Sequence, residues 1–410
     1  MEQRGDCEAL VQDIYEKTGA VLSYNTLRRM FGLAEYRKPR ESTLDQLAVY
    51  CGFRSFKDFC QRFSEVDTWP SWEGLYVELS KTNIQELIEM LRFRKLRNDQ
   101  FTISFTIVVR ELLYRKDLDS LLNLFREPTF QFANLPYDEV AQIGVLVGLH
   151  FRNFDDLAFE RTLLLEPNFR DLVFKLFVDY GRLSAKYGDW VAYLSKTEGL
   201  DTETQTFILC IDIWRRILTK QSIEQKQLKQ LPALSNEQHP ILFGRIFGIQ
   251  FLTTKSKGRK EDLKKQMLQR IAEQPQFVTE LLYEPAVQSL VTCRAELQQF
   301  VWENEYLVND IKFWYHFSQV SIHRVFQVSM LLRAKQYAKA KQILDNIPYG
   351  HIRHGYREFV ELYVAFFRWK IALALGAENV IELSEQFYKR RQSLNYPLFT
   401  DSYFEKYFDS

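Results

Sequence analysis

The sequence is poor in the residues that interrupt regular structure. Its 410 residues include only 16 Gly and 11 Pro. Because these two residues supply most tight turns, their scarcity disfavours a turn-rich β architecture and favours long helices. A chain of this length is also too long for one small hydrophobic core, so we expect two or three domains.

Cysteine is scarce as well. The chain has five cysteines, an odd number, and no two of them are spaced as C-x-x-C. They are Cys7, Cys51, Cys60, Cys210 and Cys293. This pattern predicts neither a zinc site nor a disulfide framework, and we expect reduced thiols.

No hydrophobic run approaches the length of a membrane span. The longest apolar stretches, such as IGVLVGL at residues 143–149, are far too short to cross a bilayer. The opening MEQRGDCEAL is too polar for a signal peptide, so we expect a cytoplasmic protein with no membrane partner. The net charge is only +1, and any attraction to nucleic acid must therefore come from a local basic patch.

The motifs of catalysis are missing too. The sequence has no Walker loop, no G-x-G-x-x-G, no H-E-x-x-H and no G-x-S-x-G. His351 and His354 lie three residues apart, but no acidic or cysteine ligand accompanies them at a matching spacing. We predict no catalytic residue, no metal and no cofactor. An enzyme is the third hypothesis, which a deep polar pocket with clustered titratable groups would revive.

Helical periodicity is abundant, and it begins in a compact head over residues 1–64. In CEALVQDIYEKTG the apolar residues recur at helical spacing as far as Gly19, which is a typical C-terminal stop. SYNTLRRMFG follows, with Ser23 as a possible N-cap. We expect Leu27, Met30 and Phe31 of this second helix to face inward.

A second helical hairpin closes the head in LDQLAVYCGFRSFKDFCQRF, residues 44–63. Ala48 and Gly52 would allow two helices to meet at a tight turn, and Ser55 could cap the next helix. That helix would carry Phe56, Phe59 and Phe63 on one face. The polar, Pro- and Trp-containing stretch that follows predicts a junction over residues 65–75.

Residues 76–410 predict helix after helix, with a repeat. YRKDLDSLLNLFREP, HFRNFDDLAFERTLLLEP, KYGDWVAYLSKTEG, GRKEDLKKQMLQRI and RAKQYAKAKQILDNIP each contain a short turn, an apolar anchor and an amphipathic helix. The anchors Leu118, Phe154, Trp190, Leu263 and Tyr337 are separated by 36, 36, 73 and 74 residues. A period near 36 to 37 residues is typical of two-helix repeats that bury a continuous core. QYAKAKQILDNIP and NFDDLAFERTLLLEP also resemble the second helix of a tetratricopeptide repeat.

The head resembles the helix-turn-helix domain of phage-repressor and Cro-type regulators. The similarity covers LVQDIYEKTGAVLSYNTLRRMFGLAEYRKPRESTLDQLAVYCGF. In that family a helix ending in Gly precedes the recognition helix, and a loop leads to a helix that begins P-x-x-x-T-L-x-x-L-A. Gly19, the S-Y-N-T-L-R-R stretch and residues 39–48 stand in these places. The resemblance implies that residues 23–31 enter the major groove of double-stranded DNA. The residues expected to contact DNA are Tyr24, Asn25, Arg28, Arg29, Arg37, Lys38 and Arg40.

The chemistry of this segment suits DNA. Between Arg28 and Arg40 there are five basic residues, and Glu35 is the one acid. Such an excess favours phosphate contacts, which supply most of the affinity of DNA-binding proteins. Asn can pair with adenine and Arg with guanine, so the helix carries base-reading side chains as well.

Two other interpretations of the head stay open. LAVYCGFRSFKDFCQRF resembles the second helix-turn-helix of AraC-type regulators, which would place Arg54, Ser55, Lys57, Gln61 and Arg62 on DNA. Alternatively, the head is a docking module that does not bind DNA, because its ten basic and nine acidic residues leave it nearly neutral.

The predicted fold is all-α, a helix-turn-helix-like bundle over residues 1–64 followed by an α-solenoid of tetratricopeptide-like hairpins over residues 76–410. This order resembles bacterial transcriptional regulators in which a repressor-type head is fused to repeats that sense a peptide or protein. It implies a homodimer with a peptide or protein ligand in the solenoid groove. A candidate site for an acidic ligand is HIRHGYREF, with His351, Arg353, His354 and Arg357. The alternative function is a non-enzymatic interaction scaffold.

Overall fold

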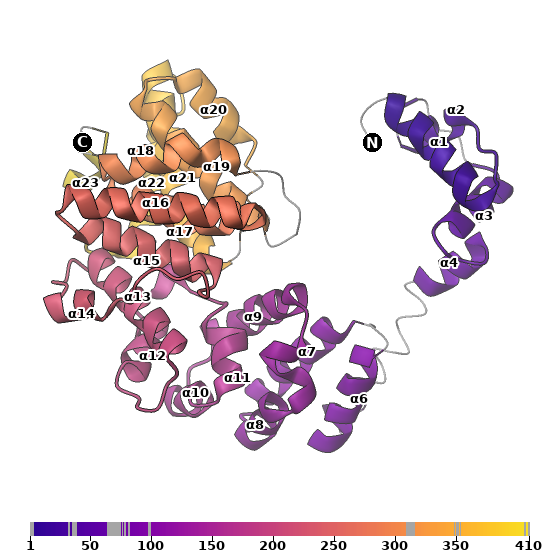
Figure 1. Ribbon diagram of the computed structural model, residues 1–410, viewed down its shortest axis with the longest axis horizontal. Coiled ribbons are helices and arrows are strands. Elements are labelled where there is room, and N and C mark those ends of the chain that lie inside the picture. The colour runs from indigo at the N-terminus through magenta and orange to yellow at the C-terminus, as the bar shows by residue number, and fades with distance from the viewer. Residues whose placement is uncertain are drawn as a thin grey trace. The chain divides into compact units, whose positions relative to one another are not determined.

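The structure is a computed structural model that describes residues 4–31, 33–34, 39–63, 75, 77, 79–80, 83–96, 100–308, 316–347, 349, 352, 354–405 and 407–408. All regular elements in these ranges are helices, so the all-α prediction is confirmed (Figure 1). No helix in these ranges is both long and apolar enough to cross a membrane. The chain divides into two compact units, Met1–Glu89 and Met90–Ser410. A junction over residues 65–75 stays a prediction, since Leu75 alone of that range is described.

The first unit is built on a small core shared by three short helices. Its four side chains Cys7, Ile14, Leu22 and Leu27 are almost fully buried. The helices of this unit are α1 (Arg4–Thr18), α2 (Tyr24–Met30), α3 (Glu41–Tyr50) and α4 (Phe56–Phe63), and α6 (Ile84–Leu96) begins in it. Tyr50 of α3 donates a hydrogen bond to the Asp13 carboxylate of α1, which also pairs with Lys17 at 2.9 Å. These contacts join α1 to α3.

The turn between α1 and α2 follows the prediction in most respects. Gly19 has a φ of +70°, and its N–H donates to the Tyr15 carbonyl at 2.8 Å, as expected of a helix C-terminus. Ser23 occupies the N-cap position, although its side chain makes no capping hydrogen bond. Leu27 is buried, but the expectation for Phe31 is wrong, because Phe31 is 46% exposed. The helix ends at Met30, so helical periodicity no longer sets the direction of the Phe31 side chain.

The hairpin between α3 and α4 also confirms its local signals. Gly52 has a φ of +88°, and a Cβ at this position would meet no atom within 4 Å, so the glycine is needed for its conformation rather than for space. The Asp58 N–H donates to Ser55 Oγ at 3.1 Å, which confirms Ser55 as the cap of α4. The rings of Phe56 and Phe59 lie 6.0 Å apart. The side chain of Phe63 lies outside the described residues.

The second unit consists of helices joined by short turns. Its helices are α7 (Phe101–Tyr114), α8 (Leu118–Arg126), α9 (Tyr137–Arg152), α10 (Leu157–Leu164), α11 (Pro167–Phe169), α12 (Lys186–Leu194), α13 (Thr202–Leu218), α14 (Gln225–Gln230), α15 (Pro240–Thr253), α16 (Lys257–Glu273), α17 (Val278–Thr292), α18 (Ala295–Asn304), α19 (His316–Arg333), α20 (Tyr337–Asp345), α21 (His354–Leu375), α22 (Val380–Leu394) and α23 (Asp401–Glu405). Short helical turns are η1 (Pro128–Phe130), η2 (Phe132–Asn134), η3 (Arg170–Phe174), η4 (Tyr180–Arg182), η5 (Pro275–Phe277) and η6 (Glu305–Leu307).

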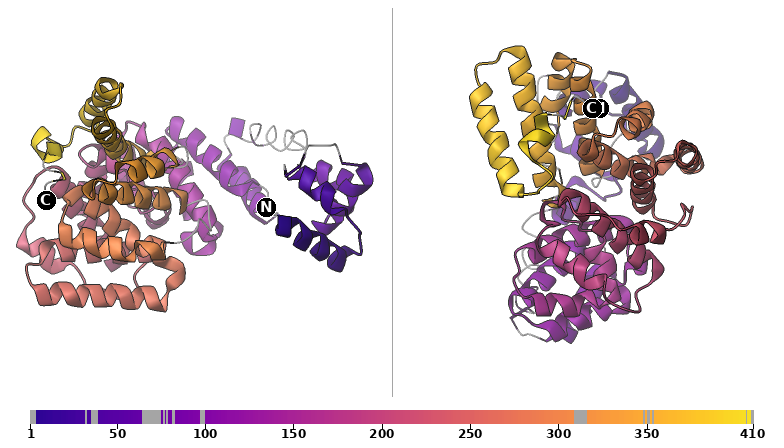
Figure 2. Two further views of the ribbon diagram at one scale, coloured as in Figure 1. Left: turned by 90° about the horizontal axis from the view of Figure 1, so that it is seen from above. Right: turned by 90° about the vertical axis from the view of Figure 1, so that its left-hand side faces the viewer.

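One type of helix end recurs in this unit. After α7 the N–H groups of Lys116 and Asp117 donate to Leu113 and Leu112, and Lys116 has a φ of +56°. The same pair of bonds with a left-handed residue follows α13 at Lys220, α19 at Lys335 and α21 at Gly376. This arrangement satisfies the last carbonyls of a helix and turns the chain sharply. It forms the hairpins α7/α8, α19/α20 and α21/α22, the last of which is clear in the right-hand view of Figure 2.

The long helices of the unit pack against one another in chain order. α7 packs on α9 and α9 on η3, while α13, α15, α17, α19 and α21 form a second succession of neighbours (Figure 1). The shorter helices α8, α10 and α12 pack in the same way. Of the repeat anchors, Phe154, Trp190 and Leu263 are buried, and Leu118 and Tyr337 are half-buried where their helices begin.

Two pairs of glycines permit close approaches to neighbouring parts of the unit. On α9, a Cβ at Gly144 would lie 2.5 Å from the Leu172 carbonyl oxygen, and one at Gly148 would lie 2.2 Å from the Phe177 ring. On α15, a Cβ at Gly244 would lie 2.3 Å from the Leu281 carbonyl oxygen, and Gly248 meets Gln288 even more closely. In both helices the glycines are four residues apart, so they share one face.

The segment of residues 396–407 is bonded to parts of the second unit far away in sequence. The Leu398 N–H donates to the Leu218 carbonyl at 3.0 Å. The hydroxyls of Tyr403 and Tyr407 donate to the carbonyls of Val291 and Leu290, both at 2.8 Å. This segment therefore ties the ends of α13 and α17 together.

Candidate functional site

The predicted DNA-reading helix is α2, and its described side chains divide into two groups. Leu27 fixes the helix on the core of the first unit. Asn25 is exposed and Arg29 is half-buried. Since residues four apart share one helix face, these two side chains form the outward-facing pair of α2.

Tyr24 and Arg28 are engaged within the unit. Tyr24 packs against the core cluster. The guanidinium of Arg28 lies 5.5 Å from the Tyr24 ring, and its Nη2 donates to the Leu33 carbonyl at 3.2 Å. Arg28 therefore stabilises the turn that follows α2.

The other predicted DNA contacts are only partly within the described residues. Arg40 is exposed at the N-cap position of α3, whereas Arg37 and Lys38 lie outside the described residues. In the alternative interpretation the residues around α4 contact DNA. Of these, Arg54, just before the helix, and Lys57, in its first turn, are exposed. Ser55 caps that helix, and the side chains of Gln61 and Arg62 are not among those described.

Of the four residues predicted to bind an acidic ligand, only Arg357 has a side chain that the structure describes. His351, Arg353 and the side chain of His354 lie outside the described residues. The Nε of Arg357 donates to Glu361 at 3.2 Å, and Arg390 pairs with the same carboxylate at 2.5 Å. Arg357 thus has an acidic partner one helical turn away.

A cavity in the second unit was not anticipated from the sequence. It has a volume of about 120 Å³ and is lined by side chains from α9, α13, α15, α17, α19 and α21 and from the chain around η2 and η3. The lining residues are Phe132, Tyr137, Asp171, Lys175, Leu176, Val178, Glu203, Phe207, His239, Ile241, Leu242, Arg245, Tyr283, Ser318, Gln319 and Tyr356. Aromatic and aliphatic side chains make up most of the lining, and the titratable groups Asp171, Lys175, Glu203, His239 and Arg245 lie among them.

One lining residue of the cavity, Arg245, belongs to a buried ion pair. Arg245 of α15 pairs with Glu284 of α17, and the Tyr180 hydroxyl donates to the same carboxylate at 2.9 Å. The Arg245 guanidinium also lies 5.1 Å from the Phe207 ring. Burial opposes the charge on Arg245, but Glu284 outweighs burial and raises the pKa of Arg245 above its ordinary value. Burial, reinforced by Glu284, raises the pKa of Tyr180 as well.

The remaining charges of the cavity lie nearer to solvent. Lys175 pairs with Asp171 at 2.7 Å and with Glu203 at 3.5 Å. Glu203 is exposed and Asp171 is half-buried, whereas Gln319 is only 6% exposed. Among the described residues, the side-chain oxygen of Gln319 has no hydrogen-bond partner. An unpaired buried acceptor is costly, so this oxygen is available to a donor that enters the cavity.

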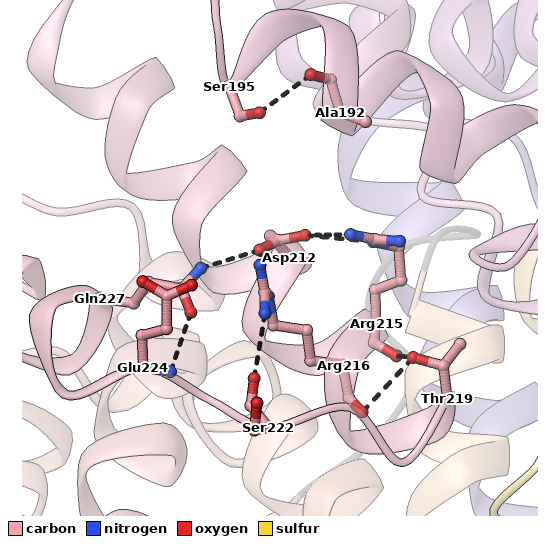
Figure 3. Close-up of polar contacts among 9 residues, drawn as sticks. All are labelled: Ala192, Ser195, Asp212, Arg215, Arg216, Thr219, Ser222, Glu224 and Gln227. Carbon is pink, nitrogen blue, oxygen red and sulfur yellow. Dashed lines mark hydrogen bonds and ion pairs between the residues drawn. The ribbon is translucent and has the colours of Figure 1, made fainter.

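A second polar cluster, around Asp212 of α13, is satisfied internally. Its carboxylate accepts hydrogen bonds from Arg215 at 2.7 Å, from Arg216 at 2.9 Å and from Gln227 of α14 at 2.9 Å (Figure 3). These partners lower the pKa of Asp212 although burial opposes them. The cluster holds α14 against α13 and offers no free group for chemistry.

One feature of the sequence does point to the cavity. Arg245 is the one charged residue in PILFGRIFGIQFLT, which forms α15. A charge in such an apolar helix predicts a buried and paired side chain. Its partners Glu284 and Phe207 come from α17 and α13, and no spacing in the sequence indicates that these elements meet.

Comparisons of the chain with protein-family models, with curated proteins and with solved structures found no match. In the described part of the chain, no group of three or more His, Cys, Asp or Glu side chains is arranged to hold a metal ion. The functional argument therefore depends on the geometry of the two units.

Proposed function

We propose that the chain is a DNA-binding transcriptional regulator whose first unit is a helix-turn-helix-like domain. The observation that carries this proposal is the outward pair Asn25 and Arg29 on α2, a short helix fixed from behind by Leu27. Asn can donate and accept on an adenine edge, and Arg can donate twice to guanine. Arg40 at the beginning of α3 is available for a phosphate contact.

Arg28 has a different role in this proposal. Its hydrogen bond to the Leu33 carbonyl holds the turn that follows α2. Arg28 is then a positioning residue, and Asn25 and Arg29 are the base-reading residues.

For the second unit we propose a tetratricopeptide-like α-solenoid that binds a peptide or protein partner and mediates dimerisation. The chain-order packing of its long helices and the recurrence of one turn after α7, α13, α19 and α21 support this proposal. A symmetric dimer would place two heads on two half-sites, as helix-turn-helix proteins do.

The test is a salt titration on a pool of labelled duplexes. Affinity should fall linearly on a log-log plot with salt, because phosphate contacts release counterions. The Asn25→Ala, Arg29→Ala double variant should weaken specific binding at least about tenfold, since one bidentate base contact contributes about 1–3 kcal/mol. Arg54→Ala, Lys57→Ala is the matched control on α4. If the control loses binding and the α2 variant keeps it, the rival placement on α4 is correct.

A non-enzymatic interaction scaffold is the second candidate function. The internal engagement of Tyr24 and Arg28 favours it, because two of the four side chains predicted to read DNA from α2 are used in folding. A scaffold would show no salt-dependent binding to any duplex. It would still retain its protein partner when Asn25 and Arg29 are replaced.

A further inference from the structure

We propose that the cavity of the second unit is a binding site for a small organic amine that carries one aromatic ring. The site is independent of DNA binding and of any peptide partner. Its volume of about 120 Å³ exceeds the space of a single water several-fold. It is smaller than the roughly 300–1,000 Å³ of pockets for drug-sized ligands, which favours a ligand with a single ring.

The charges of the wall favour a cation. The charged residues of the lining are Lys175, Arg245, Asp171 and Glu203, and Arg245 pairs with Glu284, which lies outside the lining. Arg245 is neutralised by Glu284, so the excess negative charge is at the solvent side, where two carboxylates share one ammonium group. A second ammonium there would complete the pairing, whereas a carboxylate or phosphate would be repelled.

The interior favours a ring with a hydrogen-bond donor. Tyr137, Phe207, Tyr283 and Tyr356 supply aromatic walls, which stack on rings and attract cations. The unpartnered oxygen of Gln319 is buried and can accept a hydrogen bond but cannot donate one. We therefore place the ligand's ammonium beside Asp171 and Glu203, and an O–H or N–H of its ring against Gln319.

This orientation can be tested with three matched compounds on the full chain in the absence of DNA. Tyramine has the ring, the ammonium and a ring hydroxyl. 2-Phenylethylamine lacks the hydroxyl, and 3-(4-hydroxyphenyl)propionate has a carboxylate in place of the ammonium. By titration calorimetry, tyramine should bind with a Kd below about 1 mM, and the carboxylate compound should bind at least about tenfold more weakly.

Two variants distinguish the two ends of the ligand. Glu203→Gln should weaken both amines about tenfold, because it removes a charge-assisted contact. Gln319→Leu should weaken tyramine about fivefold and leave 2-phenylethylamine unchanged, since only tyramine has the donor. Glu378→Gln, which replaces an exposed carboxylate beyond the C-terminal end of α21, should change neither. Thermal unfolding confirms that each variant is folded, and the loss of Gln319 removes no hydrogen bond of its side-chain oxygen within the described residues.

Three results would overturn the proposal. The first is that neither amine binds, or that the carboxylate compound binds equally well. The second is that Glu203→Gln and Gln319→Leu leave tyramine binding unchanged. The third is that acetyl-Ala-Phe-Lys-amide binds in the cavity more tightly than tyramine, which would make the site a peptide site. None of these results bears on DNA binding by α2, so the two proposals fail separately.

Discussion

The hydroxyl of Tyr396 donates a hydrogen bond of 2.6 Å to the main-chain carbonyl of Tyr180, 216 residues earlier in the chain. The same hydroxyl accepts a bond of 2.9 Å from the N–H of Leu183. All three residues are buried, so one side chain satisfies two main-chain groups that water does not reach. Tyr180 in turn reaches Glu284, and this places the turn η4 at the centre of the second unit.

Tyr396→Phe is therefore expected to destabilise the second unit. It leaves the Tyr180 carbonyl and the Leu183 N–H unpaired, and each unpaired buried group costs about 1–3 kcal/mol. Urea unfolding monitored by circular dichroism measures the loss as a lower midpoint. Tyr306→Phe is the control, because Tyr306 is 76% exposed, and it should stay within about 0.5 kcal/mol of wild type. Equal midpoints for the two variants would contradict the assigned role of Tyr396.

Replacement of glycine by alanine should have opposite effects on the stability of the protein at Gly148 and at Gly258. Gly148→Ala would place a methyl group against the Phe177 ring, and overpacking of this kind costs about 1–3 kcal/mol. Gly258→Ala on α16 meets nothing closer than 3.9 Å and should stabilise by up to about 1 kcal/mol through helix propensity. The free energy of unfolding of both variants checks this. A Gly148→Ala protein as stable as wild type would show that α9 and the chain at Phe177 can separate without cost.

The ion pair between Arg245 and Glu284 should behave non-additively. Removing either partner leaves the other charge buried and unpaired, at a cost of about 3–5 kcal/mol. The double variant Arg245→Leu, Glu284→Met should recover much of that loss, since apolar residues of similar size can replace a buried pair. A double-mutant cycle on the free energy of unfolding gives the coupling. If the losses of unfolding free energy in the two single variants simply add in the double variant, each charge is stabilised by other groups and not by its partner.

His323 predicts a pH dependence of stability. Its Nδ1 lies 3.1 Å from the Glu305 carboxylate and its Nε2 lies 3.4 Å from the Thr279 carbonyl, so both nitrogens face acceptors. Only the protonated ring can donate to both. Burial lowers the pKa of His323, but Glu305 and the nearby Glu280 outweigh burial, and the pKa in the folded protein is raised.

The sign of the effect follows from that raised pKa. The stabilisation is complete below the unfolded pKa of about 6.5 and is lost as pH rises through the folded pKa. The difference in unfolding free energy between wild type and His323→Gln should therefore be larger at pH 6 than at pH 8.5. Burial raises the pKa of Asp179 to about 6, but Asp179 is common to both proteins and cancels in the difference. A difference that is constant with pH would show that folding does not raise the pKa of His323, and a smaller difference at pH 6 would show that the folded ring is neutral.

The local signals of the sequence were reliable where short-range chemistry decides the structure. Gly19, Gly52 and Ser55 have the backbone or capping roles expected of them, because these roles involve only residues up to four positions away. Phe31 was misplaced because the end of α2 changes the direction of its side chain. The bond from Arg28 to Leu33 depends on the same helix end and could not be anticipated.

The cavity could not be predicted for a different reason. Its walls come from positions between Phe132 and Tyr356, and their meeting depends on packing distances that periodicity does not encode. Gln319 is an ordinary polar residue in its own helix, and only the surrounding helices make its oxygen a buried acceptor. By contrast, the position of Asn25 and Arg29 on the side of α2 away from the buried Leu27 follows from helical spacing.

The bonds made by residues 396–407 also set an order of events during protein synthesis. The core of the first unit needs nothing beyond Tyr50, so it can form while the ribosome is still translating the rest. The second unit cannot pair the carbonyls of Tyr180, Leu290 and Val291 until Tyr396, Tyr403 and Tyr407 have emerged. Until those residues have been translated, the second unit lacks the partners of these three carbonyls, so its native hydrogen bonds can be completed only near the end of synthesis.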